Sequence, residues 1–361
     1  MIPYEFIPRT QPSAQALAIV PVLTVALSML CGTALFFILG KPAGVAFYAF
    51  FIEPFLTSYN LSEIAIKAAP LILIAQGLAI GFRARIWNIG AEGQLTIGAI
   101  CAGLIPITWP QSENILMLPA MIFVGTVMGM SWAAIAAWLR TAFNASEIIV
   151  TLMLNAIAIQ ILLYLINGPL KDPRGFSFPQ SITFPEVALY PLLIKDSFLR
   201  ANVSIYLVLA LSLLAWIYVR HSFSGFRLLV GGLTPSAAHY AGFSAKRTVW
   251  ISLLVGGAAA GLAGVGEISG PIGKLQPILS PAYGFAAIIV AFLGGLNPIG
   301  IVIAGFFMAV IYVGADGAVL QAGLPASAPI VFQGFILIFY LASHTLVNFK
   351  LRRIGETKEA T

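Results

Sequence analysis

The residues that could do chemistry gather in one polar segment, Arg83–Gln94, between two apolar runs. Asn88, Glu92 and Gln94 place two amides and a carboxylate there, in a chain of which only 9% of the residues are charged. Such groups can form hydrogen bonds with a polar ligand, or they can cap broken helix ends and satisfy backbone groups that have no other partner. The residue types alone leave both roles open.

Two asparagines elsewhere raise the same question. Asn155 lies inside an apolar run, where a polar side chain is costly unless it lines a pathway or bonds to a neighbouring helix. Asn297 precedes Pro298, and this position favours helix capping. We therefore predict a pathway lined by Asn88, Glu92, Gln94, Asn155 and Asn297, with capping as the alternative, most of all for Glu92 and Asn297.

Catalytic and metal-binding patterns are missing from the sequence. His221 and His344 have no companion at metal-ligand spacing, and the chain has no Gly-x-x-x-x-Gly-Lys-Ser/Thr loop for ATP. An intramembrane enzyme would need a nucleophile paired with a base, and no such pair occurs. We expect no catalytic residue, no metal and no cofactor.

The composition places the chain in the membrane. Hydrophobic residues make up 60% of the chain, and its mean hydropathy is +0.97, whereas about a quarter of the residues of a soluble protein are charged. The apolar runs do not alternate as the strands of a membrane barrel do. We expect helices in a lipid bilayer, and we interpret the net charge of +6 as a topology signal that implies no nucleic-acid partner.

A helical span needs roughly 20 apolar residues, so the chain has room for about ten. We predict an all-α polytopic fold, in one transmembrane domain over residues 1–361, with two weakly repeated halves and some broken or half-length helices. The third and eighth runs are short. The predicted spans are Ala16–Leu39, Ile64–Phe82, Leu95–Trp109, Leu118–Leu139, Ile148–Ile166, Val203–Val219, Val249–Val265, Ala282–Leu293, Ile299–Val313 and Ile330–Val347.

The runs that flank the polar segment, Ala68–Phe82 and Leu95–Ile107, predict helices of roughly 22 and 20 Å, too short for a bilayer core of about 30 Å. Two short helices would place the break between them below the membrane surface. A second short run ends at Gly294–Pro298, so the same features recur in the second half. Paired breaks of this kind indicate a transport pathway.

The basic residues predict the orientation. With an even number of spans and both ends in the cytoplasm, twelve of the 19 Lys and Arg residues face the cytoplasm, among them Arg83 and Arg85 as interface anchors. The connection 168–202 is then external, and its five prolines exclude a regular helix. It is either a docking surface or a simple connector. The polar tail 355–361 is expected to be disordered.

The longest cytoplasmic connection, 220–247, contains a predicted short helix, Pro235–Ala241. Thr234 can cap its start, and Gly242 suits its end. A helix of two turns cannot cross a membrane, so it would lie at the surface and present Ala237, Ala238 and Ala241 as a face of small residues. The alternative is a connector without a partner.

This connection also resembles a known family. It is similar to the coupling loop of bacterial ABC importer permeases of the ribose, nucleoside and branched-chain amino acid group. The similar pattern is Gly225-Phe226-Arg227, a spacer ending at Gly231-Gly232, and then Pro235-x-Ala-Ala-x-x-Ala-Gly242. Ser236 and His239 depart from the family pattern, which has a polar or acidic residue and a basic one there. Three further motifs resemble the nucleoside and simple-sugar branch: Trp87–Gln94 followed by Gly98-Ala99, Glu147–Asn155, and Gly294–Gly300.

The resemblance implies the permease subunit of an ATP-driven importer for a nucleoside or a simple sugar, in a bacterial inner membrane. It implies three kinds of partner: a cytoplasmic ATPase subunit, a second permease chain, identical or different, and an extracytoplasmic substrate-binding protein. The implied ATPase contacts are Gly225, Arg227, Gly231, Pro235, Ala237, Ala238, Ala241 and Gly242.

An ion-coupled secondary transporter is the alternative, because it too would have broken helices. Such a transporter needs buried carboxylates paired with cation sites. Glu92, Glu147, Glu267 and Asp316 lie near spans, but all of them can be placed at span ends.

Overall fold

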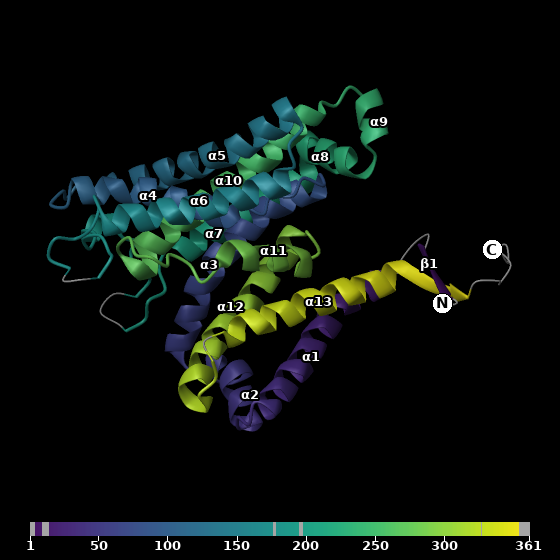
Figure 1. Cartoon of the computed structure of the whole chain (residues 1–361), viewed down its shortest axis with the longest axis horizontal. Helices are drawn as coiled ribbons and strands as arrows, with labels where there is room; N and C mark the ends of the chain where they lie inside the picture. The colour runs from purple at the N-terminus through teal and green to yellow at the C-terminus, as the bar shows by residue number, and fades with distance from the viewer. Residues whose placement is uncertain (1–3, 9–13, 176–177, 195–197, 326, 354–361) are drawn as a thin grey trace. The chain divides into compact units, whose positions relative to one another are not determined.

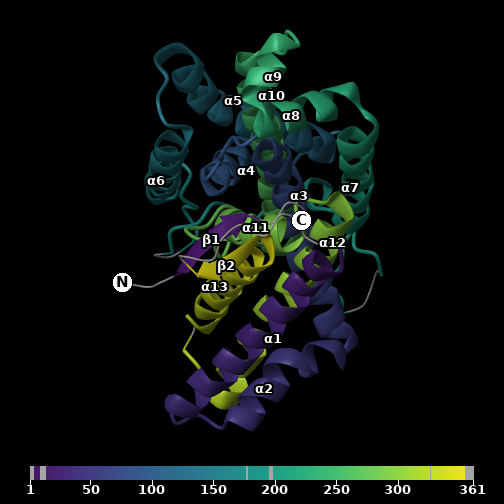
Figure 2. The same ribbon diagram turned by 90° about the vertical axis from the view of Figure 1, so that its right-hand side faces the viewer.

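The computed structural model describes residues 4–8, 14–175, 178–194, 198–325 and 327–353 (Figures 1 and 2). These residues form two compact units: residues 53–313 make up one, and the stretches 1–52 and 314–361 make up the other. The predicted disordered tail, 355–361, lies outside the described residues.

The all-helical membrane fold is confirmed. Eight helices in the described part of the chain are long and apolar enough to cross a membrane, and each of the ten predicted runs lies in a helix. The helices are α1 (Ala14–Ile38), α2 (Ala43–Phe51), α3 (Ser58–Arg83), α4 (Ala91–Thr108), α5 (Met117–Phe143), α6 (Glu147–Asn167), α7 (Ser204–His221), α8 (Phe223–Leu233), α9 (Pro235–Tyr240), α10 (Ala245–Glu267), α11 (Tyr283–Leu293), α12 (Pro298–Ala322) and α13 (Ala328–Asn348).

The helix before the polar segment is longer than predicted. α3 has 26 residues and α4 has 18, which correspond to about 39 and 27 Å. The expectation of two sub-length helices is therefore wrong for α3. The helix starts ten residues before the apolar run Ala68–Phe82, at Ser58, where the Thr57 side chain accepts a hydrogen bond from Asn60 N at 3.1 Å. α11 is short as predicted, with 11 residues.

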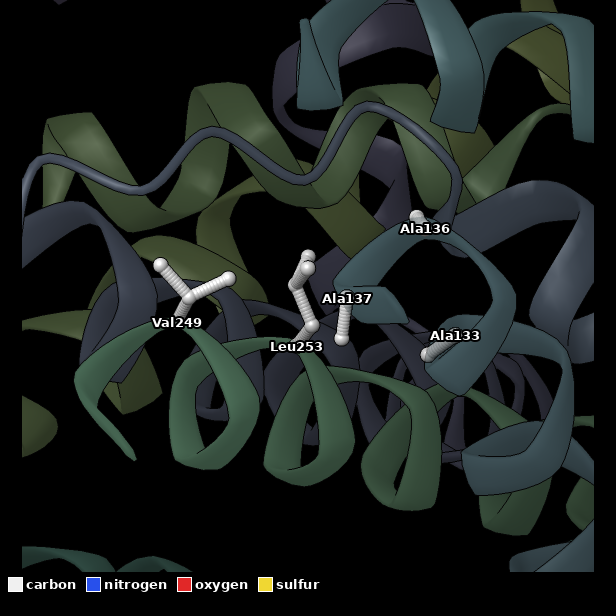
Figure 3. Packing of buried hydrophobic residues seen from close by; sticks show 5 residues of the cluster. All are labelled: Ala133, Ala136, Ala137, Val249 and Leu253. Atoms are coloured by element: carbon white, nitrogen blue, oxygen red, sulfur yellow. The ribbon is translucent and has the colours of Figure 1, made fainter. Parts of the chain in front are cut away.

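Helix α10 is the centre of the larger unit and packs against α3, α4 and α5. Small residues let its backbone approach α5 closely, as is common between membrane helices. A Cβ added at Gly261 would collide with the carbonyl oxygen of Gly125. Toward one end of this contact α5 carries alanine in place of glycine, and its Ala133 and Ala137 pack with Leu253 of α10 (Figure 3).

The smaller unit brings the two ends of the chain together. α1 packs on α13, and Phe36, Phe50 and Phe332 form an aromatic cluster with ring centroids 4.6–6.0 Å apart. Strand β1 (Tyr4–Pro8) precedes α1 and pairs antiparallel with β2 (Phe349–Arg353), which follows α13. The segments next to the two termini therefore lie side by side (Figure 2).

The proline-rich connection 168–202 has no α-helix among its described residues, as predicted; it contains one short 3-10 turn, Glu186–Ala188. It is nevertheless ordered by hydrogen bonds to the segment that follows α10. Backbone amides of Ser181, Phe184 and Tyr190 donate to carbonyls in the segment Ser269–Leu275 at 2.7–2.9 Å. The connection thus packs on the larger unit.

The connection 220–247 holds two helices, α8 and α9. The short helix was predicted, whereas α8 was not, because Gly225, Gly231 and Gly232 are weak helix formers. Capping and packing compensate: the Ser222 hydroxyl accepts a hydrogen bond from Gly225 N at 2.9 Å, and Leu228 packs against α3.

Candidate functional site

The polar segment between α3 and α4 is held by a pair of amides. Asn88 Nδ2 donates to Gln94 Oε1 at 2.9 Å, and Gln94 Nε2 donates back to Asn88 Oδ1 at 3.0 Å. Asn88 Oδ1 also accepts from Gly90 N at 2.9 Å. Both side chains are buried. The two amides therefore form a bridge that closes the turn into α4.

Helix α6 clamps the same segment from the side. Asn155 Nδ2 donates to the Ile89 carbonyl at 2.8 Å, and Asn155 Oδ1 accepts from Gly93 N at 2.7 Å. The Thr151 hydroxyl accepts from Ile89 N at 3.2 Å. Three of the predicted residues, Asn88, Gln94 and Asn155, are thus brought together, and in this conformation they satisfy backbone groups of the break.

Glu92 acts on another helix. Its Oε2 accepts a hydrogen bond from Gly284 N at 2.7 Å, and its Oε1 accepts from the Ser280 hydroxyl. Gly284 lies in the first turn of α11, whose own cap residue, Ala282, provides no side-chain hydrogen bond. A carboxylate is favourable at a helix N-terminus, so Glu92 caps α11 from α4.

Asn297 lies apart from this network. It is exposed, and its Oδ1 accepts from Ile299 N at 3.1 Å, at the start of α12. This is the capping role that the neighbouring proline favoured.

The two breaks, expected to be counterparts, lie in contact. Arg83, the last residue of α3, donates from Nε and Nη2 to the Leu296 carbonyl at 2.9 and 2.8 Å. Phe292 stacks on Phe82 and on Trp87, with centroids 5.3 and 5.9 Å apart. The sequence offered Arg83 only as an interface anchor. Its position at the edge of one break was the signal for this second role.

Helix α8 packs on the first break, which is the segment between α3 and α4. Leu228 packs with Ile80 and Ala84, and a Cβ at Gly232 would collide with the Arg83 carbonyl. The segment predicted to couple to a partner is therefore in direct contact with the end of α3.

Helix α9 differs from its prediction in two details. Ala237 and Ala241 are exposed, but Ala238 is buried, so the three alanines do not form one exposed face. Ala238 faces inward because the chain turns back after α9, where Phe243 N donates to its carbonyl at 2.9 Å. Thr234 holds the cap position without a side-chain capping bond, whereas Gly242 ends the helix at φ +74° as expected.

A basic pocket of about 130 Å³ opens beside α9. Arg227 and Arg247 line it, together with Phe243. The Arg227 guanidinium lies over the Phe223 ring at 4.3 Å and the Phe243 ring at 5.2 Å, so cation–π contacts hold it in place. The pocket has the charge that suits a carboxylate.

A larger cavity of about 330 Å³ lies among α3, α5, α7 and α10. Its walls are almost wholly apolar, and Gln76 is the amide among them. Sequence reasoning missed Gln76, although a lone amide inside the apolar run 68–82 was a usable signal. The lining residues are Leu73, Gln76, Gly77, Ile80, Thr126, Leu211, Leu214, Ala215, Tyr218, Val255, Ala258, Ala259 and Leu262.

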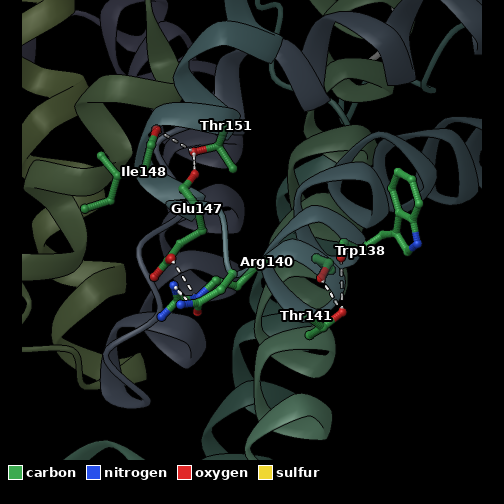
Figure 4. Close-up of polar contacts among 8 residues, drawn as sticks. Trp138, Arg140, Thr141, Glu147, Ile148 and Thr151 are labelled. Atoms are coloured by element: carbon green, nitrogen blue, oxygen red, sulfur yellow. Dashed lines mark hydrogen bonds and ion pairs between the residues drawn. The ribbon is translucent and has the colours of Figure 1, made fainter.

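One buried carboxylate has a basic partner. Glu147 forms an ion pair with Arg140 Nε at 3.3 Å (Figure 4), whereas Glu267 is buried at the end of α10. Beside Glu267, in the connection 168–202, burial raises the pKa of Tyr190 to about 12. Among the described residues, no group of three or more His, Cys, Asp or Glu side chains could hold a metal.

Comparison with known proteins identifies the family. Residues 60–341 match the family described as branched-chain amino acid transport system / permease component. The glucose ABC transporter permease TsgB13 of Haloferax volcanii is 32% identical over 96% of this chain and 92% of its own length. The guanosine permease NupP of Bacillus subtilis is 27% identical, over 93% of this chain and 97% of its own. The nucleoside permease NupB of Lactococcus lactis is 29% identical, over 95% and 96%.

No solved structure matches the chain significantly. The family match nevertheless covers most of the sequence, and the helices are those of a multi-pass membrane protein. The chain therefore belongs to the family of branched-chain amino acid transport system permease components, and it is the membrane permease of an ABC transporter, in which a separate subunit hydrolyses ATP.

Proposed function

We propose that this permease imports a nucleoside or a simple sugar by alternating access. The observation that carries the proposal is full-length similarity to permeases named for glucose, guanosine and nucleosides. An ion-coupled mechanism would instead require carboxylates free to bind a cation, whereas Glu92 caps a helix and Glu147 forms an ion pair with Arg140.

The contacts support a route from the ATPase to the pathway. An ATPase subunit that closes on ATP would press on the exposed Ala237 and Ala241 of α9, and a carboxylate of that subunit would enter the pocket of Arg227 and Arg247. Motion of α8 would reach Arg83 through their contact, and Arg83 would carry it to the second break. The two breaks would then move together.

The proposed topology places both termini in the cytoplasm of a bacterial cell, with this chain in the inner membrane. Pairing of β1 with β2 supports termini on one side of the membrane, and the excess of basic residues supports the cytoplasmic side. Reporter fusions at the two ends should give the same side. A second permease chain, and an external binding protein that docks at the connection 168–202, complete the proposed transporter.

The coupling role can be tested by changing the surface of α9. Ala237→Trp should abolish association with the ATPase while membrane insertion is kept, because Ala237 is exposed and an indole there would hold the partner away. The matched control is Gln111→Trp, because Gln111 is exposed in the connection between α4 and α5. This variant should copurify with the ATPase as the wild type does. Normal copurification of Ala237→Trp would contradict the coupling role of α9.

A further inference from the structure

We propose that Arg200 is a latch that closes the space between α3, α7 and α10 at one end, and that its release opens a small cavity lined by Glu267. This end is the one next to the connection 168–202, which the proposed topology places on the external side. The inference rests on the proposed transport function and deepens it, because alternating access requires one end of the helices to close while the other is open.

Arg200 joins three elements at this end. Its Nη1 pairs with Glu63 Oε1 of α3 at 3.2 Å, and its Nη2 donates to the Pro271 carbonyl at 2.9 Å. Pro271 lies in a single π-helical turn, Ile268–Ile272, that follows α10. Such turns are rare and occur frequently at functional sites. Arg200 thus ties the connection to α3 and to the segment after α10.

The backbone next to the Arg200 side chain is held by α3 as well. The Ser62 hydroxyl oxygen accepts hydrogen bonds from Arg200 N and Ala201 N, both at 2.8 Å. Ser62 is buried, whereas the ion pair of Arg200 with Glu63 is partly open to solvent. An ion pair at a surface contributes little stability by itself. These contacts can therefore hold the end closed and still be broken reversibly.

The hydrogen bonds divide this end into two sides. On one side, the connection 168–202 is bonded to the segment after α10: Ser181 Oγ accepts from Leu275 N at 2.9 Å, in addition to the backbone bonds between the two segments. These two segments therefore form one body. On the other side is the start of α3, which this body meets at Arg200 and Ala201.

A small cavity lies next to the latch. Its volume is about 20 Å³, which is room for about one water molecule. Asn202, two positions after Arg200, lines it, and so does Pro271, whose carbonyl Arg200 binds. Glu267 and Ser204 line it as well, and both are buried. An ionisable side chain buried among membrane helices is costly and is a sign of function. The latch therefore closes the cavity at a site where a carboxyl group is buried.

The larger cavity, of about 330 Å³, adjoins the small one. Leu73 of α3 and Leu262 of α10 line both cavities. From these two residues the larger cavity extends along α7 to Tyr218, in the last turn of that helix, which leads into α8. The space between α3, α7 and α10 is thus narrow at the latch and wide toward α8. This arrangement is the one expected of a conformation that is closed on the side of the latch.

The test is the reactivity of a thiol placed in the small cavity. In the full-length chain in nanodiscs, Cys31→Ser and Cys101→Ser remove both native cysteines, and Ser204→Cys adds a buried thiol for a membrane-impermeant maleimide. Adding Arg200→Gln should raise the labelling rate by about tenfold, because a loss equivalent to one hydrogen bond favours the open form. Arg174→Gln is the matched control, an exposed arginine of the same connection, and should leave the rate unchanged.

An unchanged labelling rate in Arg200→Gln would overturn the proposal, and so would an equal rise in Arg174→Gln. Because labelling needs neither the ATPase nor a solute, failure of this inference is distinguishable from failure of ATP-driven import.

If Arg200→Gln fails to fold, a disulfide decides the question. Ser62→Cys with Ala201→Cys, without the native cysteines, would join the two sides at the latch, whereas Ser181→Cys with Leu275→Cys would join residues within one side. The first disulfide should stop ATP-driven uptake until it is reduced, and the second should leave uptake unchanged. Uptake that continues while the first disulfide is formed would overturn the proposal.

Discussion

Single residues at the break carry structural tasks that explain their unusual types. Asn88, Gln94 and Asn155 satisfy one another and the backbone around them, and Glu92 caps a helix from outside. A polar side chain inside a membrane protein is stable when its hydrogen bonds are made within the protein. In the conformation described here, this network closes the break. A role in lining the pathway remains a prediction for a different state of the transporter.

Glu92 gives the first residue-scale prediction. Glu92→Ala removes the acceptor for Gly284 N and Ser280 Oγ and leaves both buried donors without it, so the free energy of unfolding should fall by about 2–3 kcal/mol. Glu92→Gln keeps one acceptor oxygen and should be milder. Thermal unfolding of the purified protein measures the difference. A variant as stable as the wild type that no longer transports would instead favour a direct role in the pathway.

Arg83 gives the second prediction at the scale of single residues. Arg83→Gln loses the forked contact with the Leu296 carbonyl, so uptake should fall by about tenfold while ATP hydrolysis continues, because the breaks no longer move together. Arg85→Gln is the matched control: Arg85 is two positions away and exposed. An equal loss of uptake in both variants would mean that only the local positive charge matters, and not the contact with the Leu296 carbonyl.

At this scale the sequence predicts which residues are unusual but not their partners. The polar types between two apolar runs marked Asn88, Glu92 and Gln94 without any structure. The residue capped by Glu92 could not be found that way, because it lies 192 positions along the chain and a glycine amide carries no side-chain signal. Gln76 was overlooked because it stands alone in its run.

At the scale of elements, glycine determines how closely α10 packs on α5. Gly261→Ala would place a Cβ against the Gly125 carbonyl, and overpacking of this kind should cost about 1–3 kcal/mol and lower the yield of folded protein. Gly266→Ala on the same helix meets nothing within 4 Å and should be neutral or slightly stabilising, since alanine is the better helix former. Comparable yields for both, measured by size-exclusion chromatography, would contradict this packing.

Hydropathy predicted the helices correctly where packing and helix propensity favour the same structure. All ten apolar runs are helical, and the end of α9 at Gly242 was predicted from its glycine. α2 and α8 were missed, and for α8 the reason is physical: three glycines weaken the local signal, and contact with α3 restores the helix. α3 extends past Glu63 and Lys67 because charges near a span end need not stop a helix.

At the scale of the whole molecule, the larger unit connects three features that are distant in sequence. The surface helix α9 continues from α8, α8 rests on the first break, and Arg83 joins that break to the second. The same unit holds the cavity, with Gln76 bonded to the start of α12. Force applied at one end therefore has a continuous set of contacts through which to reach the cavity.

The central claim is that ATP hydrolysis by a separate subunit drives import through this chain. The most direct test is uptake of labelled guanosine into proteoliposomes that contain the permease pair, with and without the ATPase subunits, at constant ATP and with an ionophore present. The account predicts uptake that requires both the ATPase and ATP and is unaffected by the ionophore. Uptake without any ATPase, or uptake that collapses with the ionophore while ATP is held constant, would contradict it.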